Sequence, residues 1–205
     1  MTTLVLLRHG ETPLTPQRRL SGSGGSDPGL SPAGRGQARA AADALARRGG
    51  IGAIVTSPMR RCQETAHWAA ARLGLSVRVD RDLREADFGA WEGLTFAQVR
   101  ERHPDDLDAW LASPESPPSG GGETMRQVTR RVTAVRDELL ARHAGATVLV
   151  VSHVGPLRTL IRLALQAPPH TLFHMELAAA SLSTLTYTAP GEAMLHSLND
   201  THHLG

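Results

Sequence analysis

The sequence contains no lysine, and all 22 of its basic residues are arginine. This absence excludes a Schiff-base lysine, a Walker-type phosphate loop and the conserved strand lysine of protein kinases. The arginines are spread along the chain and offset by 20 acidic residues, which leaves a formal net charge of +2. Because no basic tail or stripe forms, we expect no nucleic-acid partner.

Cysteine and aromatic residues are also scarce. The single cysteine, Cys62, cannot form an internal disulfide, and no Cys/His cluster has zinc-binding spacing, so no metal site is expected. Aromatic residues make up only 3% of the chain, so alanine, leucine and valine must fill most of the core. No signal-peptide pattern and no apolar run of membrane-spanning length is present. The expectation is a cytoplasmic protein without a membrane partner.

The order of predicted elements favours an α/β fold. Helical and strand patterns alternate, with crossovers long enough for parallel pairing. This predicts a single domain over residues 1–205, a three-layer α/β/α structure with a mainly parallel central sheet. The predicted strands span 3–8, 53–56, 76–80, 147–151, 180–188 and 193–198, and the main helices span 32–48, 58–73, 123–143 and 155–166.

Residues 81–122 break the alternation. Short helices are predicted from Thr95 and around residues 105–112, and a loop rich in proline, serine and glycine follows over 113–122. We interpret the segment as a helical insertion over the C-terminal edge of the sheet, because it is too short for a core of its own.

Two predicted strands end in histidine. The apolar run 4–7 leads into Arg8, His9 and Gly10, and the run 147–151 leads into Ser152 and His153. Ligands of open α/β sheets bind at the edge of the sheet formed by the carboxyl ends of the strands. A neutral imidazole such as that of His9 can attack phosphorus, and a protonated His153 would stabilise the phosphoryl oxygens.

Phosphoryl oxygens also require cations, for which the planar guanidinium is well suited. Arg8 is one candidate, and the start of the helix after Ser57-Pro58 offers Arg60 or Arg61, which the residues alone do not separate. Arg158, one turn into the next helix, is interpreted as structural.

A leaving alkoxide needs a proton, so a carboxylic acid is expected near the site. Glu85 lies in the irregular segment close to Phe88 and Trp91, whose apolar surfaces favour an uncharged acid. Asp87 and Glu92 are rival candidates.

Four motifs occur in order along the chain, over residues 7–12, 57–66, 83–93 and 152–155. Together they resemble the histidine phosphatase superfamily, the phosphoglycerate-mutase-like fold. The resemblance covers nearly the whole chain and is greatest to the phosphatase branch, in particular the α-ribazole phosphatase and acid phosphatase type.

The resemblance implies roles for individual residues. It makes His9, Glu85 and His153 catalytic, with His9 as the phosphorylated nucleophile and Glu85 as the proton donor. It assigns phosphate binding to Arg8, Arg61 and Thr15, and substrate binding to Arg19, Ser21 and Gly22. Thr15 stands where the family has asparagine, and Cys62 where alanine is usual.

The implied function is hydrolysis of a phosphomonoester through a phosphohistidine, with a small phosphorylated metabolite as substrate and no cofactor. A phosphoglycerate-type phosphomutase and a non-catalytic phospholigand-binding domain are the alternatives, and a homodimer is left open.

Overall fold

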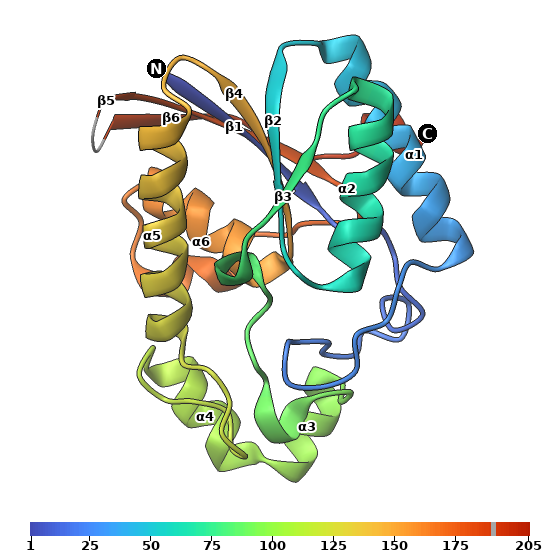
Figure 1. The fold of residues 1–205 in the computed structure, drawn as a ribbon. Helices are drawn as coiled ribbons and strands as arrows, with labels where there is room; N and C mark the ends of the chain where they lie inside the picture. Colours follow the sequence, from blue (N-terminus) through green and yellow to red (C-terminus); the bar gives the residue numbers. More distant parts are fainter. Residues whose placement is uncertain (190–191) are drawn as a thin grey trace.

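A six-stranded mixed sheet organises the computed structural model, which describes residues 1–189 and 192–205 (Figure 1). The strand order is β3-β2-β4-β1-β5-β6, and β1, β2, β3 and β4 are parallel to one another. β5 is antiparallel to β1, and β6 is antiparallel to β5. This confirms the predicted α/β architecture. The strands are β1 (Thr2–Arg8), β2 (Ile51–Thr56), β3 (Val77–Val79), β4 (Thr147–Ser152), β5 (Leu182–Ala189) and β6 (Glu192–Asp200).

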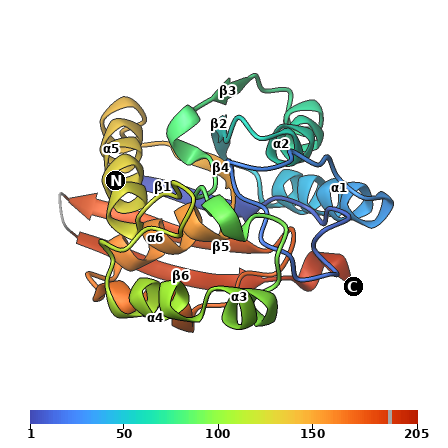
Figure 2. The ribbon, with the colours of Figure 1, turned by 90° about the horizontal axis from the view of Figure 1, so that it is seen from below.

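Both faces of the sheet are covered by helices, so the central strands are apolar on both sides. In β1, Leu4 and Leu6 pack towards α5 and α6, whereas Val5 and Leu7 pack towards α1 and α2. Figure 2 shows the two helix pairs on opposite sides of the sheet. Their bounds are α1 (Pro32–Arg48), α2 (Arg60–Leu73), α5 (Met125–Arg142) and α6 (Val154–Ala164).

The register of the parallel strands brings the two histidine motifs together. Arg8 at the end of β1 pairs with Ser152 at the end of β4, so His9 and His153 follow at the same level. The next parallel strand, β2, aligns Thr56 with Val151, which places the start of α2 at the same edge. Residues far apart in sequence therefore meet at the carboxyl ends of three adjacent strands.

The insertion lies below this edge in Figure 1 and carries α3 (Phe96–Arg102) and α4 (Pro104–Ala112). The insertion gathers a small apolar cluster, against which Leu20 and Met125 from outside the segment also pack. Trp91, Val99, Leu107 and Trp110 are buried together, and the Trp91 indole Nε1–H donates to Asp106 over 2.9 Å. Four short 3₁₀ segments complete the described structure: η1 (Arg81–Leu83), η2 (Gly89–Trp91), η3 (Pro169–His174) and η4 (His202–Leu204). Among the described residues, no helix has the length and apolar character needed to cross a membrane.

Candidate active site

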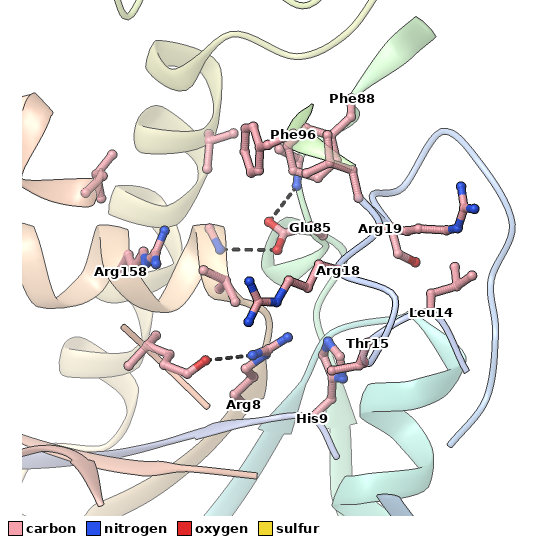
Figure 3. A pocket seen from close by; sticks show the side chains of 18 of the residues that line it. Arg8, His9, Leu14, Thr15, Arg18, Arg19, Glu85, Phe88, Phe96 and Arg158 are labelled. Atoms are coloured by element: carbon pink, nitrogen blue, oxygen red, sulfur yellow. Dashed lines mark hydrogen bonds between the residues drawn. The ribbon is translucent and has the colours of Figure 1, made fainter. Parts of the chain in front are cut away.

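A cavity of about 570 Å³ opens at the carboxyl ends of the strands (Figure 3). Its wall is built from the end of β1, the following loop, the starts of α2 and α6, the insertion and η3. Seven of the nine predicted site residues line it: Arg8, His9, Thr15, Arg19, Ser21, Arg61 and Glu85. His153 and Gly22 do not.

The His9 imidazole is held in a defined tautomer. Its Nδ1 lies 2.8 Å from the carbonyl oxygen of Gly10, and because a carbonyl can only accept, Nδ1 carries the hydrogen. The other ring nitrogen, Nε2, therefore keeps its lone pair. Burial first, and then the charges of Arg8 and Arg61, lower the pKa of His9 well below its usual value. His9 is thus a neutral imidazole at neutral pH, as a nucleophile must be.

The structure separates the two arginines at the start of α2. Arg61 is 1% exposed and donates from Nη2 to the carbonyl oxygen of Ser21 over 2.8 Å, while its Nε lies 3.2 Å from His153 Nδ1. Arg60 is exposed and pairs with Glu64. Arg61 is therefore the residue of the two that faces the cavity.

Arg8 supplies a second cation beside His9. Its Nη1 donates to the carbonyl oxygen of Leu177 over 2.6 Å, which fixes the side chain against the segment after η3. Its Nε is buried and has no hydrogen-bond partner among the described residues. Burial lowers the pKa of Arg8, an effect that the carboxylate of Glu85 opposes.

His153 lies behind His9, with the two ring centroids 5.1 Å apart. Because Arg61 Nε donates to Nδ1, the Nε2 of His153 carries the hydrogen and donates to Ser57 Oγ over 2.7 Å. Burial, and then the charges of Arg61 and neighbouring groups, hold the pKa of His153 well below its usual value. His153 is thus a neutral imidazole that orients Arg61, in place of the protonated histidine expected from the sequence. Cys62 packs against the same ring, and burial raises the pKa of its thiol.

Glu85 is the acid that reaches the cavity. It is 7% exposed, and its carboxylate accepts from the backbone N–H of Ala86 over 2.9 Å and of Gly155 over 3.2 Å. A Cβ atom at residue 155 would lie 2.3 Å from Glu85 Oε1, so glycine is required there for this approach. Of the two aromatic residues expected near Glu85, Phe88 lines the cavity with it, whereas Trp91 belongs to the core of the insertion.

The two rival acids bind backbone instead. Glu92 accepts from the N–H groups of Gly22 over 2.9 Å and Phe88 over 3.2 Å, and Asp87 accepts from Gly89 over 2.8 Å. Both therefore hold loops in place, and the cavity wall includes neither of them.

The loop after β1 distributes the remaining predicted residues unevenly. The Thr15 hydroxyl accepts from the backbone N–H of Thr12 over 3.0 Å, which ties it to its own turn. Arg19 directs its guanidinium to Gln17 and to the carbonyl oxygen of Gly93. Ser21 Oγ is buried without a hydrogen-bond partner in the described part of the chain. Gly22 is held against Glu92, away from the cavity.

Two arginines of the cavity wall, Arg18 and Arg158, were not predicted as site residues. Arg158, interpreted above as structural, has its side chain on the cavity side of α6 (Figure 3). Three aromatic side chains of the wall were not predicted either, and the Trp110 ring lies between those of Phe96 and Phe173 in the series of ring contacts.

The two buried histidines predict a specific loss of stability in weak acid. Their lowered pKa values mean that, below about pH 6.5, the unfolded chain binds more protons than the folded chain. The free energy of unfolding should therefore fall as the pH drops from 7 to 5, by at most about 1.4 kcal/mol per pH unit for each histidine. Urea denaturation across this range measures the slope. The variant His153→Gln should flatten it, while replacement of the exposed His67 should not, and equal slopes in all three proteins would contradict the assignment.

Comparison with known proteins agrees with this geometry. The model of the histidine phosphatase superfamily (branch 1) matches residues 4–201. The chain therefore belongs to the histidine phosphatase superfamily, branch 1.

Three known proteins show how similar the chain is to other members of the superfamily. It is 50% identical over 203 residues to bifunctional protein Rv2228c of Mycobacterium tuberculosis, covering 99% of this chain and 55% of that protein. The chain thus spans about half the length of that relative. It is 33% identical over 205 residues to phosphoserine phosphatase 1 of Hydrogenobacter thermophilus, covering 100% of this chain and 95% of that protein. A solved structure of mycobacterial glucosyl-3-phosphoglycerate phosphatase with inorganic phosphate has a TM-score of 0.84 and 33% identity, with 99% of each chain covered.

Proposed function

We propose that this protein hydrolyses phosphomonoesters of small metabolites through a phosphohistidine formed on His9. The observation that carries the proposal is the tautomer of His9. His9 Nδ1–H donates its hydrogen to the Gly10 carbonyl oxygen. The lone pair of the neutral Nε2 is therefore free, in a cavity that also holds Arg8, Arg61 and Glu85. Phosphoryl transfer requires mainly such positioning and charge neutralisation.

In the first step, Arg8 and Arg61 bind the phosphoryl oxygens and Nε2 of His9 attacks phosphorus. The phosphorus–nitrogen bond forms as the ester phosphorus–oxygen bond breaks. Glu85, protonated at this stage, gives its proton to the leaving oxygen, so the product leaves as an alcohol. His153 acts indirectly, because its ring orients Arg61.

In the second step, water attacks the phosphorus atom of phosphohistidine. The Glu85 carboxylate accepts the proton of the water, the phosphorus–nitrogen bond breaks, and inorganic phosphate leaves a neutral His9. Two easier steps thus replace direct attack by water on the ester.

The cavity supports a substrate larger than phosphate itself. Its volume of about 570 Å³ leaves room for an organic group beyond the two phosphate-binding arginines. Relatives named for phosphoserine and glucosyl-3-phosphoglycerate support a small phosphorylated metabolite. The motifs also resemble those of α-ribazole phosphatases and acid phosphatases. A substrate screen should therefore include α-ribazole phosphate and general acid phosphatase substrates.

The covalent intermediate provides the direct test. Rapid quench during turnover, followed by peptide mass spectrometry under alkaline conditions, should locate an acid-labile phosphate on His9. Turnover without any phosphorylated histidine, or with phosphate on another residue, would overturn the mechanism. Incubation with 3-phosphoglycerate distinguishes the mutase alternative, because isomerisation faster than phosphate release would make the protein a phosphomutase.

A further inference from the structure

Two arginines in the cavity wall have no role in the proposed phosphate site. Arg18 lies in the loop after β1, and Arg158 lies on α6, one turn beyond the Gly155 amide that binds Glu85. In Figure 3 the guanidinium group of Arg18 points into the cavity, towards Arg8 and Glu85. Arg158 lines the cavity on the α6 side.

Neither guanidinium group is neutralised by a direct contact. Within residues 1–189 and 192–205, no hydrogen bond or ion pair to the side chain of Arg18 or Arg158 is found, and the Nε of Arg158 is buried. The other arginines of the loop and of α2 differ in this respect, since Arg19 and Arg61 each bind oxygen atoms of the protein. Arg18 is exposed and Arg158 is half-buried, so the donors of both guanidinium groups are accessible to a ligand that enters the cavity.

The backbone of Arg18 adds a second, independent observation. Its φ of 53° lies in the left-handed region, which glycine adopts freely and arginine adopts at an energetic cost. Strained backbone of this kind is concentrated at functional sites. Here the strained conformation directs a guanidinium group into the cavity.

The charges around Arg18 and Arg158 indicate the charge of a ligand that these residues would bind. Burial lowers the pKa of Arg158, and the charges of Glu85 and then of Glu176 act in the opposite direction. Arg18 and Arg158 thus add two cations to the wall of a cavity that already holds Arg8 and Arg61, which favours a ligand with an anionic group besides its phosphate.

We infer that Arg18 and Arg158 form a specificity site for a carboxylate on the substrate, next to the phosphate-binding arginines. This inference rests on the proposed function and narrows its substrates to phosphomonoesters that also bear a carboxylate. The planar guanidinium group matches the two oxygens of a carboxylate in paired hydrogen bonds.

A pair of substrates that differ in one group tests the inference. 3-Phosphoglycerate and glycerol 3-phosphate differ only in a carboxylate that is replaced by a hydroxymethyl group. We expect kcat/KM to be at least about tenfold higher for the carboxylate compound, which corresponds to about 1.4 kcal/mol. A ratio near one or below one would overturn the inference, while hydrolysis of both compounds would leave the proposed function intact.

The variants Arg18→Gly and Arg158→Gln connect the preference to these residues. Glycine adopts the left-handed backbone conformation of residue 18 freely. The loop after β1 should therefore keep its conformation when the guanidinium group is removed. Each variant should lower kcat/KM for 3-phosphoglycerate about tenfold more than for glycerol 3-phosphate, mainly through KM. The control Arg39→Gln removes an arginine from the exposed face of α1 and should leave the ratio unchanged. Equal losses on both substrates would contradict the assignment.

Binding to a variant without the nucleophile separates this inference from catalysis. The variant His9→Ala should bind 3-phosphoglycerate at least about tenfold more tightly than glycerol 3-phosphate in calorimetry. Adding Arg18→Gly and Arg158→Gln should remove that difference. This result is expected whether or not the wild-type chain hydrolyses either compound, and equal affinities in the His9→Ala variant would reject the carboxylate site.

Discussion

The variant His9→Ala is expected to lose at least about 10⁴-fold in kcat, the scale observed when the nucleophile of a covalent mechanism is removed. The physical reason is that Nε2 of His9 is the uncommitted lone pair beside Arg8 and Arg61, and a methyl group cannot replace it. Steady-state release of phosphate from a set of phosphomonoesters measures the loss. The rapid-quench experiment should find no acid-labile phosphate in this variant.

Two controls show that the loss is chemical. Because Arg8 and Arg61 remain, His9→Ala should still bind inorganic phosphate, and its circular dichroism spectrum should match that of the wild type. The matched variant His67→Ala removes an exposed histidine from α2 and should retain full activity. Substantial residual turnover in His9→Ala, with a phosphorylated residue elsewhere, would show that another nucleophile carries the reaction.

Much of this site could be predicted from the sequence because its residues come directly after the carboxyl ends of apolar strands. The apolar run 4–7 alternates between two buried faces, and the parallel register then brings His9 to the level of His153. The choice of Arg61 over Arg60 came from the family resemblance, and the packing of α2 gives its physical reason. The small residues Cys62, Thr65, Ala66 and Ala69 define the buried face of α2, and Arg61 continues that face.

The missed residues depend on geometry that residue type does not reveal. Arg18 reaches the cavity through a left-handed backbone conformation, which nothing in an arginine predicts. His153 was expected to be protonated beside the phosphoryl oxygens, but its ring packs behind His9 because Ser57 and Arg61 bind its two nitrogens. Arg158 offered a weak signal, since it follows His153 by little more than one helical turn on a helix that starts at the site.

The bounds of the last two strands were also predicted only approximately from residue type. Their existence was predicted over 180–188 and 193–198, and the structure places them at Leu182–Ala189 and Glu192–Asp200. The alternation of exposed and half-buried residues in β6 extends beyond its apolar residues, so an apolar pattern alone underestimates its length. Neither strand contributes a predicted site residue, and the prediction of the site was therefore unaffected.

The variant Glu85→Gln is expected to slow hydrolysis of alkyl phosphates by about 10² to 10⁴-fold, the usual contribution of a general acid. Glutamine has almost the same shape, but it has no proton to give to the leaving alkoxide. An aryl phosphate such as p-nitrophenyl phosphate releases a stable phenolate and needs little protonation. Its hydrolysis should therefore fall much less in the first step, and the ratio of the two rates in one protein measures the role of Glu85 directly.

That ratio also removes the effect of any folding defect. Glutamine keeps only one of the two acceptor oxygens that bind Ala86 and Gly155, so a stability loss of about 1–2 kcal/mol is expected. Such a loss lowers both rates equally and leaves their ratio unchanged. The matched variant Asp87→Asn alters the neighbouring acid, which binds Gly89 outside the cavity, and should show no dependence on the leaving group. If Asp87→Asn showed this dependence and Glu85→Gln did not, the proton donor would be Asp87, and the carboxylate at Gly155 would serve only to hold α6 in place.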